Sequence, residues 1–224
     1  MKSKRKKRIG RLLTCCMFML VGAASVSVTS KAETLKTEDG YKYSVNDDGT
    51  ATIERYDGSE TILEIPQEID NHKVTILGSW AFSSCSGLTS ITIPNGVTSI
   101  EYSAFKGCSS LTSITIPEGV TSIERGAFSE CSSLTSITIP EGVTSIEDSV
   151  FEDCSNLVEV TLPSSIRSFG TDVFSNTMWL TNAKKNATDG MVIASNVLID
   201  GSGATGDVKI PENVSKLYPL SRTF

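Results

Sequence analysis

Hydrophobic and polar positions along the chain recur with a period of 23 residues. Four residue types keep this period in a common phase: Phe82, Phe105, Phe128, Phe151 and Phe174; Leu88, Leu111, Leu134, Leu157 and Leu180; Pro94, Pro117, Pro140 and Pro163; Cys85, Cys108, Cys131 and Cys154. Self-similarity at a fixed period of about 20 to 50 residues is the signature of repeat architectures. The chain is therefore predicted to form a repeat array.

Each unit begins with a pattern typical of a strand. In residues 113–116 polar and apolar side chains alternate, which is the period of a strand with one buried face. A turn is predicted directly afterwards, because Pro117 suits its second position and Gly119 its fourth.

The rest of the unit contains a second extended segment and a compact one. Residues 120–123 include β-branched side chains and are expected to be extended, whereas residues 126–131 are expected to form one short helical turn. One unit offers apolar side chains worth about 12 kcal/mol on burial. Ordering its residues costs more than that, so the units are predicted to stack, with parallel strands about 4.8 Å apart.

The pattern LxxIxIPxxVxxIxxxAFxxCxx resembles the BspA-like leucine-rich repeats of bacterial surface proteins, over roughly residues 41–215. The resemblance implies a curved solenoid, an α/β repeat fold of the leucine-rich-repeat type with a parallel β-sheet along one face. It also implies a secreted or surface-attached protein that acts as an adhesin or interaction protein.

The two ends of the array depart from the repeat. The predicted parts are a signal peptide at 1–32, an N-terminal capping hairpin and first strand at 33–65, the leucine-rich repeat solenoid at 66–180, and an irregular insertion with a truncated last repeat at 181–224. The capping hairpin is predicted around a turn at 46–49, because an uncovered solenoid end exposes apolar surface and a free strand edge. A second hairpin is expected at 191–199.

The first 32 residues have the pattern of a secretory signal. Basic residues precede an apolar segment from Leu12 to about Val28, and Ser30 and Ala32 supply small residues before a predicted cleavage. A retained membrane anchor is the less favoured alternative, since a membrane helix needs about 20 strongly apolar residues. The protein is therefore predicted to be secreted or at the cell surface, with no membrane insertion after cleavage.

The net charge of the chain after residue 32 indicates which kinds of partner it can bind. Residues 1–32 hold eight of the 20 Lys and Arg residues and none of the 26 Asp and Glu residues, so the remaining chain has a formal charge of −14. Such a surface repels nucleic acid and anionic lipid. The predicted partner is instead an extracellular protein or glycan.

No residue set points to catalysis or to a cofactor. His72 is the single histidine and is expected in a solvated loop within a five-residue insertion, and no GxSxG motif occurs. The four cysteines of the repeat are predicted to form an inward ladder of thiols, with disulfides as the alternative. A metal site is not expected, because the chain has no CxxC pair.

The outward face of the first strand is the predicted binding surface. If Ile91 and Ile93 point inward, their neighbours point outward. The candidate residues are Ser90, Thr92, Ser113, Thr115, Ser136, Thr138, Glu159 and Thr161. Two alternatives remain open: these small side chains simply suit a crowded sheet, or the irregular features matter more, namely Tyr102, Arg125, Trp179 and the loop at 181–207.

The function predicted from the sequence is a non-catalytic extracellular protein-protein interaction or adhesion module of a bacterial surface or secreted protein. The alternative is a structural scaffold segment of a larger surface protein, with no ligand of its own. Glu101, Glu124 and Glu147 form an acidic column at the repeat period, which is expected to be a solvated row.

Overall fold

The computed structural model describes residues 34–194, 197–200, 202 and 216–217. The chain divides into a unit of residues 1–31 and a unit of residues 32–224. The predicted signal peptide therefore lies outside the described residues. Within the part of the chain that is described, no helix is both long and apolar enough to cross a membrane.

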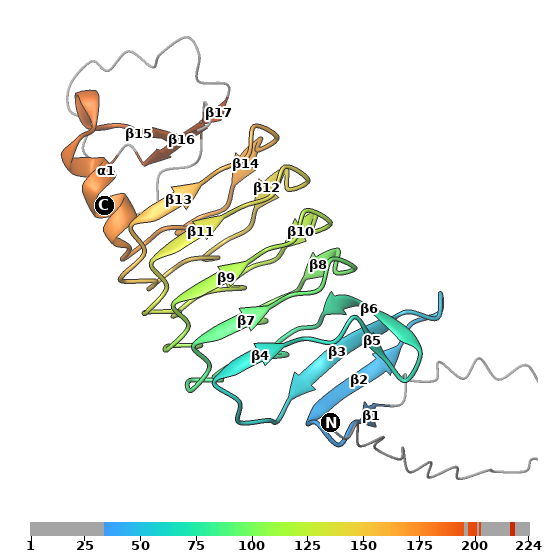
Figure 1. The fold of residues 1–224 in the computed structure, drawn as a ribbon. Coiled ribbons are helices and arrows are strands. Elements are labelled where there is room, and N and C mark those ends of the chain that lie inside the picture. Colours follow the sequence, from blue (N-terminus) through green and yellow to red (C-terminus); the bar gives the residue numbers. More distant parts are fainter. Residues whose placement is uncertain (1–33, 195–196, 201, 203–215, 218–224) are drawn as a thin grey trace, which may run out of the picture. The chain divides into compact units, whose positions relative to one another are not determined.

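Each rung of the second unit contributes one strand to each of two columns (Figure 1). The first strand column contains β4 (Ile62–Glu64), β7 (Ser90–Thr92), β9 (Ser113–Thr115), β11 (Ser136–Thr138) and β13 (Glu159–Thr161). The second strand column contains β6 (His72–Leu77), β8 (Ser99–Ile100), β10 (Ser122–Ile123), β12 (Ser145–Ile146) and β14 (Ser168–Phe169). Paired strands are parallel and offset by one repeat, as in Ser90 opposite Ser113. The predicted solenoid with parallel sheets is thereby confirmed.

The third side of each rung is a series of tight turns. The helical turn expected at 126–131 is wrong, because alternate N–H groups bond in two directions. The Ala127 N–H donates to the Glu124 carbonyl at 3.1 Å within the turn, whereas the Phe128 N–H donates to the Val150 carbonyl of the next rung at 3.0 Å. These N–H groups bond the neighbouring rung, so they are not available for the hydrogen bonds of a helix.

A stack of aromatic rings fills the interior. The rings of Phe82, Phe105, Phe128, Phe151 and Phe174 are fully or almost fully buried, and successive centroids lie 5.1, 5.3, 5.6 and 5.6 Å apart. Tyr56 extends the stack at one end and Trp179 at the other. The period in the sequence is thus a period in space, with one ring from each rung.

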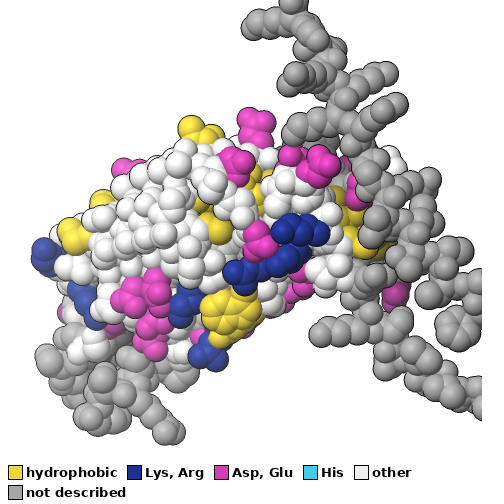
Figure 2. All heavy atoms as spheres, turned by 90° about the horizontal axis from the view of Figure 1, so that it is seen from below, with side chains coloured by type: hydrophobic (Ala, Val, Ile, Leu, Met, Phe, Trp, Pro, Cys, Tyr) yellow, Lys and Arg dark blue, Asp and Glu magenta, His cyan; other side chains and the backbone are white. Residues whose placement is uncertain are grey.

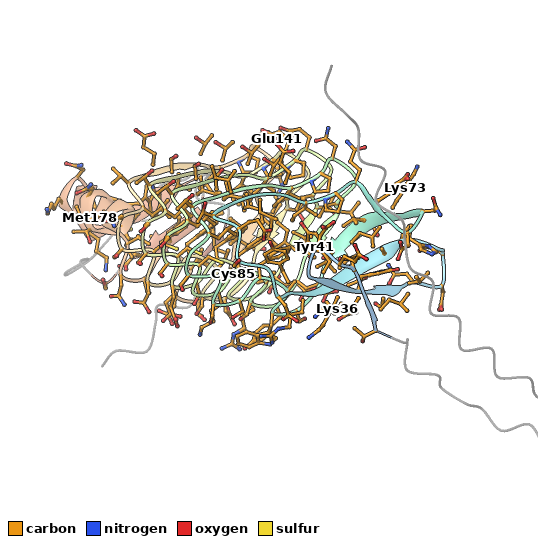
Figure 3. All side chains as sticks on the ribbon, turned by 60° about the horizontal axis from the view of Figure 1, so that its bottom comes forward. Lys36, Tyr41, Lys73, Cys85, Glu141 and Met178 are labelled. Carbon is orange, nitrogen blue, oxygen red and sulfur yellow. The ribbon has the colours of Figure 1, made fainter. Side chains whose placement is uncertain are left out.

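An antiparallel hairpin covers the N-terminal end, as predicted. It consists of β2 (Tyr41–Val45) and β3 (Ala51–Tyr56), with β1 (Leu35–Lys36) along β2, and β3 continues in parallel with β6. Figure 3 labels Tyr41 on this hairpin, and its ring is buried.

The five-residue insertion forms another hairpin between β5 (Glu68–Ile69) and β6. Asp70 and Asn71 both have positive φ, which suits a tight two-residue turn. The expected loop position of His72 is therefore wrong. His72 is the first residue of β6, and its Nδ1 lies 2.8 Å from the Gly49 carbonyl oxygen.

The C-terminal end contains a helix that the sequence pattern did not predict. Helix α1 (Met178–Lys185) begins after Thr177, whose hydroxyl accepts a hydrogen bond from the Leu180 N–H at 3.1 Å. A short 3₁₀ turn, Thr188–Gly190, follows it. The second predicted hairpin is present as β15 (Val192–Ala194) and β16 (Val197–Asp200), and β17 (Lys216–Leu217) pairs with β16 in parallel.

Candidate interaction surface

The eight predicted surface residues occupy outward positions of the first strand column. Thr92, Ser113, Thr115, Ser136, Thr138, Glu159 and Thr161 are exposed, and Ser90 is half-buried. Between them, Ile91, Ile114 and Ile137 point inward and are buried. The predicted direction of these side chains is therefore correct, and the structure brings them together on one sheet face.

The hydroxyls of this column fall into two classes. The hydroxyls of Thr89, Thr112 and Thr135 donate to a carbonyl of the preceding rung at 2.8, 3.1 and 3.4 Å. The hydroxyls of Thr92, Thr115, Thr138 and Thr161 make no hydrogen bond with the described residues. The first class joins the rungs, whereas the second has no hydrogen-bond partner among the described residues.

Two residues of β4 extend this face and were missed by the sequence analysis. Ile62 lies opposite Ser90 and is 70% exposed, and Glu64 lies opposite Thr92. The spacing from Ile62 to Ser90 is 28 residues instead of 23, so the repeat period does not align β4 with the column. The face consequently begins with an exposed aliphatic side chain and a carboxylate.

Two carboxylates of the acidic column bond the preceding rung. Glu101 Oε2 accepts a hydrogen bond from the Ser79 N–H at 3.0 Å, and Glu124 Oε2 accepts one from the Tyr102 N–H at 3.1 Å. Both carboxylates thus satisfy backbone donors of the preceding rung. The expected solvated row is therefore wrong for Glu101 and Glu124, whereas Glu147 is exposed and accepts a hydrogen bond from the Ser145 hydroxyl of its own rung at 3.4 Å.

The repeat cysteines are free thiols. Cys108, Cys131 and Cys154 are buried, and their thiols donate to the Phe82, Phe105 and Phe128 carbonyls at 3.1 to 3.2 Å. Cys85, labelled in Figure 3, is half-buried. The predicted inward thiol ladder is confirmed for the three buried residues.

The protonation of these thiols follows from their burial. Burial raises the pKa of the Cys154 thiol to about 12. A hydrogen bond with the Cys108 thiol, together with burial, raises the pKa of Cys131 well above its ordinary value. A thiol that stays protonated is neither a good nucleophile nor a good metal ligand.

Other chemistry is sparse among the described residues. In that part of the chain, no three His, Cys, Asp or Glu side chains are grouped so that they could hold a metal ion. Figure 2 shows that the face viewed there carries acidic, basic and hydrophobic side chains, and that a large hydrophobic group at its lower edge is bordered by Lys or Arg. The exposed large hydrophobic residues include Trp80 and Tyr102.

Comparison with known proteins places this geometry in a family. The model of the BspA type leucine rich repeat region matches residues 61–188 in six copies. A leucine rich cell surface protein from Faecalibacterium prausnitzii A2-165 is similar in structure, with 33% identity and a TM-score of 0.53. The match covers 65% of this chain and 46% of that one, so this chain spans less than half the length of that protein.

Two further solved structures show the same kind of likeness. The pneumococcal vaccine antigen PcpA has 20% identity and a TM-score of 0.54, with 83% of this chain and 60% of that chain covered. A leucine rich repeat protein of T. pallidum has 25% identity and a TM-score of 0.46, with coverages of 65% and 90%. No curated protein matches. Because the family model covers more than half of the chain, the chain belongs to the BspA-type leucine-rich repeat family.

Proposed function

We propose that this chain is a non-catalytic interaction module that acts outside the cell, secreted or at the cell surface, and that the first strand column is its contact face. The observation that carries the proposal is the set of unpartnered hydroxyls on that face. Thr92 lies opposite Thr115 and Thr138 lies opposite Thr161, and the four hydroxyls make no hydrogen bond with the described residues. Family membership and the F. prausnitzii surface protein support the same assignment.

The face is suited to recognition because it is rigid. Its backbone is held by two parallel ladders, β4–β7–β9 and β11–β13, and its side chains are short, so few rotamers are lost on binding. Each hydroxyl is both a donor and an acceptor. Ile62 adds an exposed apolar contact at one end of the face. A partner that presents polar groups at about 4.8 Å intervals gains several hydrogen bonds without reordering this sheet.

The partner we propose is an extracellular protein or glycan. The formal charge of −14 on residues 33–224 disfavours nucleic acid and anionic membrane surfaces. Recognition through hydroxyls requires no cofactor and no catalytic group. Binding, without chemical conversion, is the role that these side chains support.

The test is binding of residues 33–224 to immobilised extracellular-matrix preparations and to whole cells. The double substitution Thr115→Lys and Thr138→Lys places two long charged side chains in the centre of the face, and binding is expected to fall by at least about tenfold. The matched control is Thr121→Lys with Thr144→Lys, at exposed threonines beside the second strand column.

Saturable binding that both double variants retain would place the contact elsewhere. Absence of saturable binding by a chain that circular dichroism shows to be folded would favour the structural scaffold as the alternative. Loss of binding in both double variants alike would point to a general charge effect instead of a contact at the face.

A further inference from the structure

An exposed aromatic pair lies in the turns that follow β6 and β8, two strands of the second strand column. Trp80 and Tyr102 are 44% and 40% exposed, and their ring centroids are 5.1 Å apart at an interplanar angle of 79°. The Trp80 N–H donates to the Tyr102 carbonyl at 3.0 Å, which places the two residues on neighbouring rungs. These are large apolar surfaces that the core does not use.

The backbone at Trp80 is unfavourable for its side chain. Its φ is 64°, in the left-handed region, where a bulky side chain is strained. The equivalent positions of the following rungs also have positive φ and hold Ser103, Gly126, Ser149 and Asp172. A small or polar residue occupies this position on every other rung, so a tryptophan here is explained neither by the turn nor by the core.

An exposed arginine follows the aromatic pair on the next rung. The Ser103 N–H donates to the Arg125 carbonyl at 3.0 Å, which places Arg125 one rung beyond Tyr102. Arg125 is exposed, and its guanidinium makes no ion pair or hydrogen bond with the residues that the structure describes. The adjacent Glu124 carboxylate already accepts from the Tyr102 N–H. By contrast, Lys106 is paired with Glu130 at 3.0 Å.

We propose that Trp80, Tyr102 and Arg125 form a binding site for an acidic sugar, a pyranose ring that carries a carboxylate. One face of a pyranose consists of C–H groups, which pack on aromatic rings through apolar contact. The planar guanidinium presents paired donors that match a carboxylate. The phenol hydroxyl and the indole N–H make no hydrogen bond with the described residues and are available to sugar hydroxyls.

The size of the site favours a sugar over a protein. Three neighbouring rungs span about 10 Å at the spacing of parallel strands, which corresponds to one or two sugar rings. A stable protein interface needs about 800 Å² on each partner. A footprint of that size would extend well beyond these three residues. The first strand column is a separate surface, so this site is independent of the contact face proposed above.

The test is a glycan array probed with the full chain, comparing glycans that end in sialic or glucuronic acid with their neutral counterparts. Titration calorimetry with the best acidic oligosaccharide then gives the affinity. Acidic glycans are expected to bind at least about tenfold more tightly than neutral ones. Trp80→Ser, which introduces the residue found at the equivalent position 103, and Arg125→Gln are each expected to reduce affinity by at least about tenfold.

Two controls separate a site from a structural effect. Lys106→Gln removes the same charge from a paired lysine and is expected to leave affinity within about twofold, since that lysine is outside the site. Trp80→Ser is expected to leave the melting temperature within about 3 °C or to raise it, because the lost ring contact is offset by relief of backbone strain.

Three results would overturn the proposal. They are no binding to any acidic glycan, equal binding of acidic and neutral glycans, and binding that survives both Trp80→Ser and Arg125→Gln. The double variant with lysines at 115 and 138 is expected to bind the sugar normally. A failure of the sugar site is thereby distinguishable from a failure of the strand face.

Discussion

Replacing Phe128 by alanine removes one ring from the middle of the aromatic stack. The ring has no exposed surface, and its centroid lies 5.3 Å from that of Phe105 and 5.6 Å from that of Phe151. Substituting alanine for a buried phenylalanine costs about 3–5 kcal/mol of unfolding free energy. Because two ring contacts are lost together, the expected cost lies in the upper part of that range, about 4–5 kcal/mol.

The assay is urea denaturation of residues 33–224, followed by far-ultraviolet circular dichroism. Phe128→Leu is the matched control, since it keeps most of the volume and loses the two ring contacts, and it is expected to cost about 1–3 kcal/mol. A cost below about 1 kcal/mol for Phe128→Ala would refute the reasoning, because no buried stacked ring is removed that cheaply. Equal costs for the alanine and leucine variants would also refute it.

Three further outcomes test separate parts of the structure. Ellman's reagent at pH 8 is expected to leave the three buried repeat thiols unmodified until urea is added, and rapid labelling of the native protein would contradict this. Because burial raises the pKa of Cys154 to about 12, its thiol stays protonated in the native protein, whereas unfolded thiols ionise above about pH 8.5. The free energy of unfolding is therefore expected to fall as the pH rises above about 8.5. Thr112→Val is expected to lower the free energy of unfolding, measured by urea denaturation, by about 0.5–1.5 kcal/mol, because the Thr112 hydroxyl bonds the preceding rung. Thr115→Val is expected to leave that free energy almost unchanged, and equal effects of the two variants would contradict the distinction between the two classes of hydroxyl. Thr177→Ala is expected to lower the free energy of unfolding by about 1 kcal/mol and to speed amide hydrogen exchange in α1. Thr177→Ser keeps the capping hydroxyl and is expected to show a smaller effect, and unchanged exchange in the alanine variant would show that the cap is not needed.

The strand columns were predictable because the same residues recur at the same place in each rung. Alternation in 113–116 placed Ile114 inside and Thr115 outside, and the structure agrees. The turn segment was not predictable in the same way. Residues 126–131 have a spacing that suits a helix, but the carbonyls of the next rung capture alternate N–H groups. The competing carbonyls belong to another rung, so the sequence of one unit does not reveal them.

The ends were harder for a different reason. Helix α1 has only eight residues, and although Trp179 and Leu180 pack partly buried against the core, so short an apolar pattern is a weak signal of a helix. The remaining signals were Thr177 before it and Lys184 and Lys185 in its last turn. At the other end, the turn residues Asp70 and Asn71 indicated a hairpin that was interpreted as a loop.

The candidate surface was predictable in its centre and not at its border. The repeat period identified the threonine positions, but it failed at β4, where the insertion changes the spacing and conceals Ile62 and Glu64. Which hydroxyls are engaged also could not be predicted. Thr112 and Thr115 are both exposed threonines, and only the structure separates the one that bonds the preceding rung from the one that does not.

The central claim is that the chain is an array of interchangeable 23-residue rungs, and deletion of one rung tests it most directly. Removing residues 111–133 joins Ser110 to Leu134, which restores the junction that Ser110 makes with Leu111 and keeps every column in register. The account predicts a folded protein that melts cooperatively, with somewhat lower stability. Removing only residues 111–130 shifts all later columns out of phase and is expected to abolish the cooperative transition. If the 23-residue deletion unfolds the chain, or if both deletions behave alike, the account is contradicted.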